Sequence, residues 1–328
     1  MSYHHLNRSE RMVIERMKRF GSCPGEIARA LGRAPSTILR ELRRNSDRSG
    51  YDPHWANVQY WRRREQKRLR YKTGYPRLMR RVLDKLKEGW SPEQVCGRFR
   101  RHEYAHDQRM WISHETIYRY VWADKRQGGT LWKYLRKKRN KYGKRGTGRH
   151  PNQWLRGRVS IDERPAIVTA QGRIGDWEAD TIYGRNRESC MVTIVERKSL
   201  FSSAAHVPSS SAYAVNHAIL QSLLHIPKQL IHTLTLDNGK EWADFKALED
   251  QLKAAVYFTH PYSAWERPVN ENFNGLLRQY LPRKSDLRCT TAQQLDEILQ
   301  RLNNRPRKKH DYRTPQEVFR DACLALDS

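Results

Sequence analysis

Near the start of the chain, apolar residues recur at helical spacing in two short runs, one before Gly32 and one after it. Glycine suits a tight turn, and Ala28, four residues earlier, is small enough to let two helices cross closely. The pattern predicts a helix-turn-helix over residues 22–45. The residues expected to pack inward are Ile27, Ala28, Leu31, Ile38, Leu39 and Leu42.

The second helix of this motif leaves a polar and basic face outward. Such side chains contact phosphates and base edges when the helix lies in the major groove of DNA. The alternative is an ordinary helical hairpin with a solvated basic face. The candidate DNA-binding residues are Ser36, Thr37, Arg40, Arg43 and Arg44.

A second helical region follows. Leu78, Val82 and Leu86 form an apolar stripe, and Ser91 before Pro92 predicts a helix start, with Ser as the N-cap and Pro in the first helical position. Another helix is expected from residue 114, and its apolar face would comprise Ile117, Tyr118, Val121 and Trp122. The pattern resembles a second helix-turn-helix with a long central loop.

After residue 176 the pattern changes to short apolar strands mixed with helices. Strands are expected at residues 177–183, 191–195, 201–207, 230–236 and 255–259, and helices at residues 212–224, 242–252 and from residue 268. The order β-β-β-α-β-α-β-α predicts a mixed α/β domain.

The charge of the chain is concentrated in its first half. The 328 residues carry a formal net charge of +28, with 39 Lys and Arg against 14 Asp and Glu in residues 1–150, and 24 against 21 in residues 151–328. Such an excess repels itself unless a polyanion neutralises it, and nucleic acid is the commonest one. No run of about 18 apolar residues is present, so we expect no membrane-spanning segment.

Residues 125–149 hold 11 Lys and Arg, five glycines and no acidic residue. This composition is typical of a linker that is disordered when free, and it also suits a basic arm along a phosphate backbone. We expect a domain boundary here. The candidate DNA contacts in this segment are Lys137, Lys138 and Arg139.

The five cysteines are scattered and form no C-x-x-C pair, which favours free thiols in a reducing cytosol. A zinc site stays open as an alternative, because one cysteine and three histidines lie close in sequence, although their spacing matches no common zinc finger. These residues are Cys96, His102, His106 and His114.

Two carboxylates lie in or directly after the expected strands of the second half. Asp237 follows the strand at residues 230–236, and ligands of α/β sheets gather at such strand ends. Asp180 lies inside the first strand. Glu178 points to the same face of that strand, so either residue could be the one that serves a site.

A third carboxylate, Glu271, lies on the helix from residue 268. It shares a face with Asn274 and Arg278, both candidate DNA contacts, and lies away from the apolar stripe. Carboxylate oxygens suit Mg²⁺ or Mn²⁺, and two such ions about 3.5–4 Å apart can activate a nucleophile and stabilise the leaving oxygen of a phosphodiester. The alternative for Glu271 is a solvated helix face.

Three segments around these carboxylates resemble the catalytic motifs of bacterial insertion-sequence transposases. They are residues 175–180 (GDWEAD), 235–241 (TLDNGKE) and 265–272 (WERPVNEN), and 33 residues separate Asp237 from Glu271, an interval typical of DDE transposases. The tail at residues 303–306 (NNRP) and 312–315 (YRTP) resembles theirs too. Over nearly the whole chain, the sequence is most similar to the insertion-sequence-thirty family.

The resemblance implies an α/β fold with a ribonuclease-H-like core of the retroviral-integrase type, preceded by all-α helix-turn-helix domains. It implies that Asp180, Asp237 and Glu271 are catalytic and bind two Mg²⁺ ions, for which Mn²⁺ can substitute. The implied partners are double-stranded DNA, as terminal inverted repeats and target, and at least one further copy of the chain. The implied location is the bacterial cytoplasm, on the nucleoid.

The expected domains are a helix-turn-helix domain at residues 1–50, a second helical domain at 51–124, a basic linker at 125–172 and the catalytic domain at 173–328. The expected activity is metal-dependent DNA cleavage and strand transfer. Asn238, Asn270 and Asn272 either position DNA or metal-bound water, or act as caps and turns. The alternative function is a non-catalytic helix-turn-helix transcriptional regulator, while an RNA-binding protein is disfavoured because no RRM-type signature is present.

Overall fold

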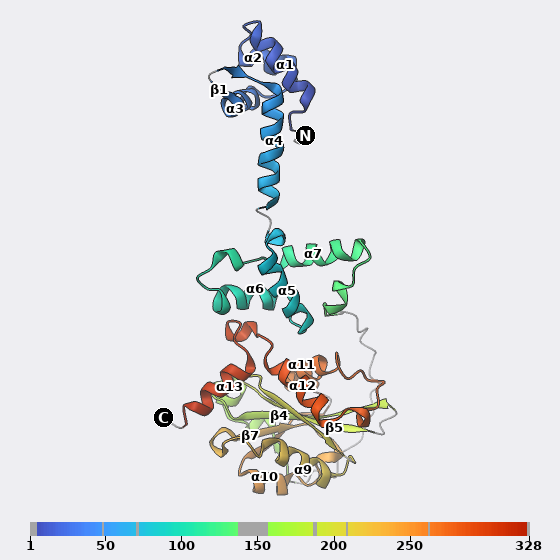
Figure 1. Cartoon of the computed structure of the whole chain (residues 1–328). Coiled ribbons are helices and arrows are strands. Elements are labelled where there is room, and N and C mark those ends of the chain that lie inside the picture. The colour runs from blue at the N-terminus through green and yellow to red at the C-terminus, as the bar shows by residue number, and fades with distance from the viewer. Residues whose placement is uncertain are drawn as a thin grey trace. The chain divides into compact units, whose positions relative to one another are not determined.

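The computed structural model describes residues 5–47, 49–69, 72–136, 157–185, 189–207, 209–261 and 263–326. The chain divides into two compact units, Met1–Arg80 and Arg81–Ser328, and the division falls within helix α5 (Pro76–Lys87) (Figure 1). Among the helices of these ranges, none is long and apolar enough to cross a membrane. The predicted domain boundaries at residues 50, 124 and 172 stay predictions.

The first unit contains the predicted helix-turn-helix. Helices α2 and α3 are joined through Gly32, whose φ of +58° is a conformation that glycine adopts without strain. Ile27, Ala28 and Ile38 are buried as expected. The elements of this unit are α1 (Arg8–Arg19), α2 (Pro24–Ala30), α3 (Pro35–Asn45), the short strands β1 (Ser46–Asp47) and β2 (Gly50–Tyr51), and α4 (Pro53–Leu69).

One inward residue of α3 was predicted wrongly. Leu39 is 54% exposed, because the inner stripe of α3 runs through Ile38, Glu41 and Asn45, which are all buried. Glu41 is tolerated there because Arg11 of α1 pairs with it at 2.7 Å.

The second helical region comprises α5, α6 (Pro92–Arg98) and α7 (His114–Arg126). Ser91 caps α6 and forms the capping box with Gln94, which confirms the predicted start. On α7 only Ile117 and Val121 are buried, whereas Tyr118 and Trp122 are exposed, so the predicted apolar face was too wide. The zinc alternative is not formed: in the ranges that the structure describes, no three His, Cys, Asp or Glu side chains lie close enough to hold a metal ion.

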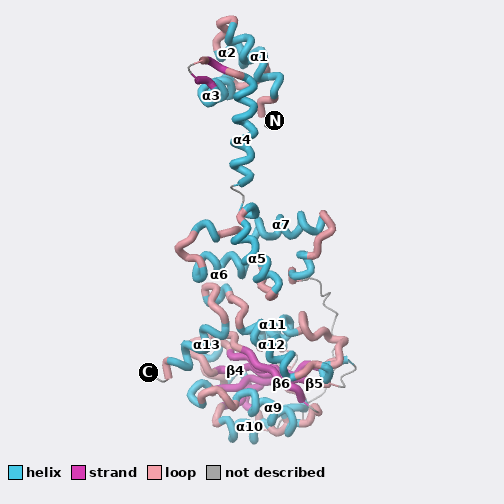
Figure 2. Tube along the Cα trace, in the orientation of Figure 1, coloured by secondary structure: helices cyan, strands magenta, loops and turns pink. Residues whose placement is uncertain are grey.

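A six-stranded sheet in the order β3-β8-β7-β4-β5-β6 forms the centre of the second unit (Figure 2). Strands β4, β5 and β6 pair antiparallel in sequence order, and β7 and β8 continue the sheet parallel to β4. This topology is that of a ribonuclease-H-like fold, which confirms the predicted fold class. The strands are β3 (Val159–Ser160), β4 (Asp176–Tyr183), β5 (Cys190–Glu196), β6 (Ser202–Val207), β7 (Thr233–Leu236) and β8 (Ala255–Phe258).

Helices cover both faces of the sheet. Helices α9 and α10 pack on one face, and α11 and α12 pack on the other, each over its own apolar core. The predicted strand at residues 230–236 begins three residues late, because Lys228–Leu230 forms a 3₁₀ turn. The helices are α8 (Ala166–Thr169), α9 (Ala212–Leu223), α10 (Phe245–Leu252), α11 (Pro268–Leu277), α12 (Ala292–Asn303) and α13 (Pro315–Leu324).

The C-terminal segment of the second unit is held against helix α6. Arg98 of α6 donates to both carboxylate oxygens of Glu317 on α13, at 2.5 and 2.8 Å. Gln94 donates to the carbonyl of Pro306 at 2.8 Å. Gly97 lies against the ring of Tyr312, with which any Cβ at this position would overlap. From Arg81 onward, the second helical region therefore shares one compact unit with the sheet.

Candidate active site

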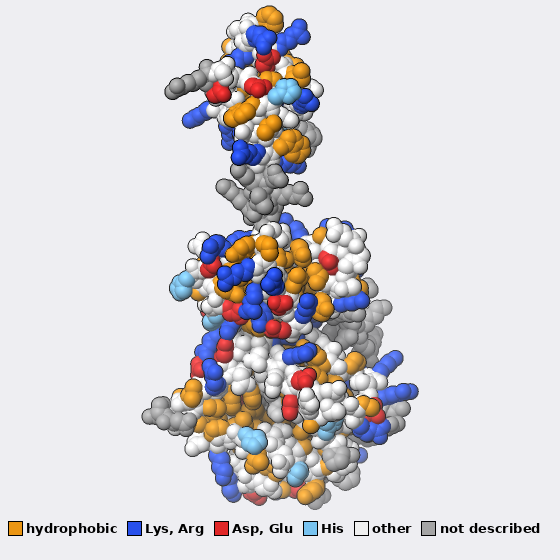
Figure 3. All heavy atoms as spheres, viewed as in Figure 1, with side chains coloured by type: hydrophobic (Ala, Val, Ile, Leu, Met, Phe, Trp, Pro, Cys, Tyr) orange, Lys and Arg blue, Asp and Glu red, His pale blue; other side chains and the backbone are white. Residues whose placement is uncertain are grey.

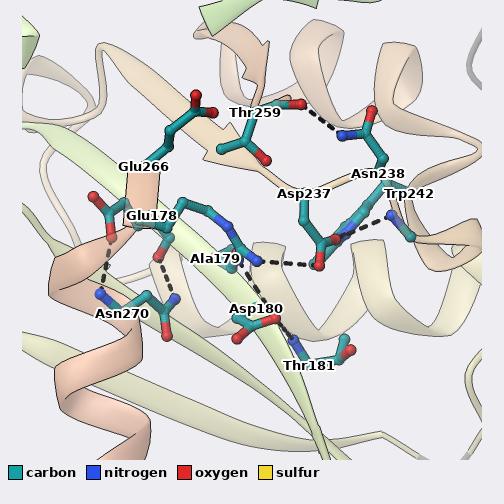
Figure 4. Close-up of polar contacts among 12 residues, drawn as sticks. Glu178, Ala179, Asp180, Thr181, Asp237, Asn238, Trp242, Thr259, Glu266 and Asn270 are labelled. Atoms are coloured by element: carbon teal, nitrogen blue, oxygen red, sulfur yellow. Dashed lines mark hydrogen bonds and ion pairs between the residues drawn. The ribbon is translucent and has the colours of Figure 1, made fainter. Parts of the chain in front are cut away.

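The sheet places Asp180 and Asp237 in one row. Strands β4 and β7 are parallel neighbours, and their register pairs Glu178 with Thr235. Two residues further along each strand direction are Asp180, inside β4, and Asp237, directly after β7. Residues two apart on a strand share a face, so the register brings the two carboxylates together although 57 positions separate them in sequence. Figure 4 shows both side chains at this end of the two strands.

Arg267, which precedes α11, bridges the two carboxylates. Its guanidinium lies 3.4 Å from Asp180 Oδ1 and 3.1 Å from Asp237 Oδ2, and it also donates to the carbonyl of Ala179 at 2.8 Å. The residue is only 8% exposed. A buried cation between two acids balances charges that would otherwise be costly to bury.

Asp180 is held from two sides. Its Oδ2 accepts a hydrogen bond from the Asn274 amide of α11 at 2.8 Å, and its Oδ1 accepts from the backbone N–H of Thr181. Burial raises the pKa of Asp180 to about 6, although Arg267 opposes the shift, and the negative charge of Asp237 raises it further. A second cation beside this carboxyl would stabilise its ionised form.

Asp237 is oriented by the segment that follows it. Its Oδ1 accepts hydrogen bonds from the indole N–H of Trp242 at 2.6 Å and from the backbone N–H of Gly239 at 3.1 Å. Asn238, at the turn, donates to the carbonyl of Thr259 and accepts from Arg158. Asn238 therefore ties the end of β7 to the end of β8, which is a structural role.

Glu178, the alternative to Asp180, is sealed inside the protein. It is fully buried, pairs with Arg197 at 2.7 Å and accepts the backbone N–H of Asn270 at 2.8 Å. Burial raises its pKa, and the charge of Arg197 opposes that shift. Its two oxygens are thus engaged within the core, whereas Asp180 keeps a quarter of its side-chain surface exposed.

Asn270 fixes helix α11 to the sheet. Its side-chain amide donates to the carbonyls of Glu178 and Thr193, at 3.1 and 3.3 Å, and its side-chain oxygen accepts from the Thr193 hydroxyl at 3.1 Å. The residue is fully buried. These contacts anchor α11 to the sheet. They therefore fix the backbone position of the next residue, Glu271. Figure 4 shows Asn270 beside Glu178.

Glu271 and Asn272 are exposed on α11. Glu271 follows Arg267 by four positions and precedes Asn274 by three, so the helix places it on the same face as two residues that contact Asp180. Its carboxylate does not join the other two here, since the described residues contain no group of three potential ligands at metal-binding distance.

The two aspartates fit a divalent cation in their chemistry. Both present hard carboxylate oxygens, which Mg²⁺ and Mn²⁺ prefer, and both already contact one shared positive charge, that of Arg267. Neutral N–H donors from Asn274 and Trp242 hold the carboxylates in place. Residues that would hold an ion are therefore Asp180 and Asp237, with Glu271 on the adjoining helix face.

The predicted DNA contacts lie in three places. On α3, Ser36, Arg40, Arg43 and Arg44 are exposed and Thr37 is partly exposed. Asn274 donates to Asp180, and Arg278 donates to the carbonyl of Tyr183 at 2.7 Å, so both have partners within the protein. Lys137, Lys138 and Arg139 lie outside the described residues. Figure 3 shows Lys and Arg side chains interleaved with hydrophobic ones on the surface of the N-terminal unit.

Sequence reasoning missed Arg267 and Arg197. Arg267 was part of the third motif, but an arginine at a helix start is usually solvated, and its pairing with Asp180 spans 87 positions. It also missed His260, which lies between Asp162 at 3.0 Å and Glu266 at 2.8 Å after strand β8. The sequence did contain one signal for Arg267, namely a basic residue directly after the carboxylate Glu266 within the third motif.

The chain is similar to known proteins in sequence. Residues 2–45 match a family described as a helix-turn-helix domain. The chain is 41% identical to the transposase for insertion sequence element IS4351 of Bacteroides fragilis, over 96% of this chain and 95% of that protein. It is 34% identical to the transposase InsI for insertion sequence element IS30A of Escherichia coli (strain K12), over 98% of this chain and 85% of that protein. A solved structure of the catalytic core domain of BIV integrase is 21% identical, with a TM-score of 0.38, and covers 48% of this chain and 100% of that one.

Proposed function

Because the chain belongs to the insertion-sequence-thirty (IS30) family of transposases, we propose that it cleaves the ends of its own element and joins them to target DNA. Asp180, Asp237 and Glu271 would hold the divalent ions of this reaction. The single observation that carries the proposal is the row of Asp180 and Asp237 on neighbouring parallel strands, with one shared cation between them.

A pair of divalent ions would activate the attacking oxygen and stabilise the leaving oxygen of the phosphodiester. The chain's own contribution is to fix the carboxylates in advance. Trp242 and Gly239 orient Asp237, Asn274 orients Asp180, and Asn270 sets the position of α11. Helix α3 would contact the DNA ends through its exposed face, and two ends held together require at least two copies of the chain.

The test is a cleavage and strand-transfer assay with Mg²⁺, on DNA that carries the sequences flanking the protein's own gene. Wild type should nick the ends and yield joined products, and Glu271→Gln should reduce the rate by about a hundredfold or more, because bound metal contributes several kcal/mol to catalysis. Glu297→Gln, an exposed glutamate of α12, is the matched control and should keep the wild-type rate.

Two results would contradict the proposal. One is wild-type activity in Glu271→Gln. The other is tight binding of the DNA ends without cleavage by the wild type, in Mn²⁺ as well as Mg²⁺, which would favour a DNA-binding regulator.

A further inference from the structure

Two arginines after helix α12 have no role in the proposed reaction. Arg305 and Arg307 belong to the tail segment that follows Asn303 and Asn304. Arg305 is only 4% exposed, and Arg307 is partly buried. Burying an arginine is costly unless its donors and its charge are satisfied.

Neither side chain is satisfied by its neighbours. Arg305 donates to the hydroxyl of Tyr280 at 3.3 Å, and Arg307 donates to the carbonyl of Leu302 at 3.1 Å. The Nε–H group of each is buried without an acceptor among the described residues. No ion pair within the described ranges involves either arginine. Buried orphan donors of this kind commonly mark the place of an ion or water.

The charges around the two arginines are also positive. Burial lowers the pKa of Arg305, Tyr280 opposes this shift, and the charge of Arg136 adds to it. Burial lowers the pKa of Arg307 to about 10, and both Arg305 and Arg136 add to the shift. Gly89 lies against the Arg305 side chain. Its neighbour in sequence, Glu88, pairs with Lys85 at 2.9 Å.

Three other buried or partly buried arginines of this unit differ in this respect. Arg197 pairs with Glu178 at 2.7 Å, Arg98 with Glu317 at 2.5 Å and Arg267 with Asp237 at 3.1 Å. Each of them also has an orphan Nε–H, but each has its charge balanced by a carboxylate. An orphan Nε–H group alone therefore does not distinguish this cluster. Its distinguishing feature is that three arginines repel one another.

The cluster adjoins the helix that carries Glu271. Tyr280, the partner of Arg305, follows the end of α11. The Arg136 guanidinium lies 4.0 Å from the place where a Cβ of Gly275 would be, and Gly275 is about 6 Å along the helix axis from Glu271. A Cβ on Gly89 would lie 2.7 Å from the Arg305 guanidinium, so glycine leaves the space that this side chain needs.

We propose that Arg136, Arg305 and Arg307 bind a phosphodiester group of DNA. The identity of the anion as DNA rests on the proposed function, since the site adjoins the helix of Glu271. Arginine is suited to this task because its planar fork matches phosphate oxygens. Phosphate contacts carry no sequence information, so the site would accept the backbone of the element's end and of target DNA alike.

The first experiment measures thermal unfolding of the full chain in inorganic phosphate and in sodium chloride of equal ionic strength. Wild type should be stabilised more by phosphate. Arg307→Gln should unfold at a higher temperature than wild type without phosphate, because one of three mutually repelling charges is gone, and should lose the phosphate-specific gain. Arg301→Gln, an exposed arginine of α12, removes the same charge and should retain that gain.

The second experiment measures DNA affinity as a function of salt, with Mg²⁺ omitted so that no cleavage is involved. Arg307→Gln should weaken binding about tenfold relative to Arg301→Gln, and should lower the log–log salt slope by about 0.9. The loss should be equal for a duplex with the element's end and for an unrelated duplex. Arg136→Gln, at an exposed position, should show the same loss of affinity. This variant replaces Arg307→Gln in the experiment if Arg307→Gln does not fold.

Opposite results would overturn the inference. These are a lower unfolding temperature in Arg307→Gln with the phosphate gain intact, or a salt slope in Arg136→Gln and Arg307→Gln equal to that of the control. Neither experiment depends on catalysis, so failure of the Glu271→Gln assay would refute the proposed reaction and leave these outcomes unaffected.

Discussion

The second unit contains two clusters of charge, each with a buried arginine, that are opposite in composition. In one, Asp180 and Asp237 share the single cation of Arg267. In the other, Arg305 and Arg307 lie with Arg136, and no described carboxylate balances them. The protein itself neutralises half of the first group's charge, so that an added cation must displace Arg267 or join it.

The difference shows where each group obtains its counter-charge. Buried charge is tolerated when a partner compensates it, and removing one partner of a buried pair costs far more than an exposed pair is worth. Arg267 is such a partner within the protein. The arginine cluster has none within the described part of the chain, which is why we assign its partner to DNA.

Among these tests, removing the charge of Arg267 should have the largest effect on stability. Arg267→Gln leaves Asp180 and Asp237 to repel each other, and the free energy of unfolding should fall by about 3–5 kcal/mol in urea titrations without divalent ions. Added Mg²⁺ or Mn²⁺ should recover part of the loss in this variant, because a metal ion can replace the guanidinium charge.

The matched control for that change is Arg320→Gln on α13, an exposed arginine. It should change the unfolding free energy by less than about 0.5 kcal/mol. Equal stability of Arg267→Gln and the control would show that the two aspartates do not depend on Arg267.

A histidine beside the arginine cluster offers a second test. Burial lowers the pKa of His310 to about 4, with Lys309 and Arg307 adding to the shift, from an ordinary value of 6.5. The unfolded chain therefore takes up this proton first, so wild type should lose stability relative to His310→Gln as the pH falls from 6.5 toward 4, by about 2 kcal/mol. Urea titrations of both proteins at pH 7 and pH 4.5 measure this, and a difference that does not vary with pH would contradict it.

The smallest effect is expected at an exposed counterpart of Arg267. His260 lies between Asp162 and Glu266, and its hydrogen bond to Glu266, the charge of Glu266 and that of Asp162 raise its pKa. Its contribution to stability should be complete below pH 6.5 and should vanish as the pH rises through the raised pKa. The unfolding temperature of wild type should exceed that of His260→Gln more at pH 6 than at pH 9. A histidine resonance that titrates below 6.5 would contradict this sign.

Local periodicity was sufficient for most elements of the fold. The helices around Gly32, the capped start at Ser91 and the strands around Asp180 and Asp237 all follow from spacing and turn chemistry. The exposed sides of Leu39 and Trp122 were assigned wrongly, because helical spacing fixes an apolar stripe only to within about one residue on either side. Whether Tyr118 or Ile117 faces inward depends on the helix packed against it, which the local pattern does not contain.

The sheet order and the pairing of charges were beyond local pattern. The fold class came from the family resemblance, since periodicity does not say that β7 lies beside β4. The row of Asp180 and Asp237 depends on that neighbourhood, and the choice between Glu178 and Asp180 depends on Arg197, which lies 19 positions away from Glu178. Metal binding by the three carboxylates stays a prediction.

The hold of the C-terminal segment on helix α6 bears on how the protein is made. Arg98 and Glu317 are separated by 219 positions, and at common rates of synthesis roughly 10–40 s pass between the addition of the two residues. During that time α6 is present without Glu317, Tyr312 and Pro306, and its polar groups face water or other molecules. These contacts join residues that are made far apart in time, so helix α6 reaches its final packing only after Glu317 has been added.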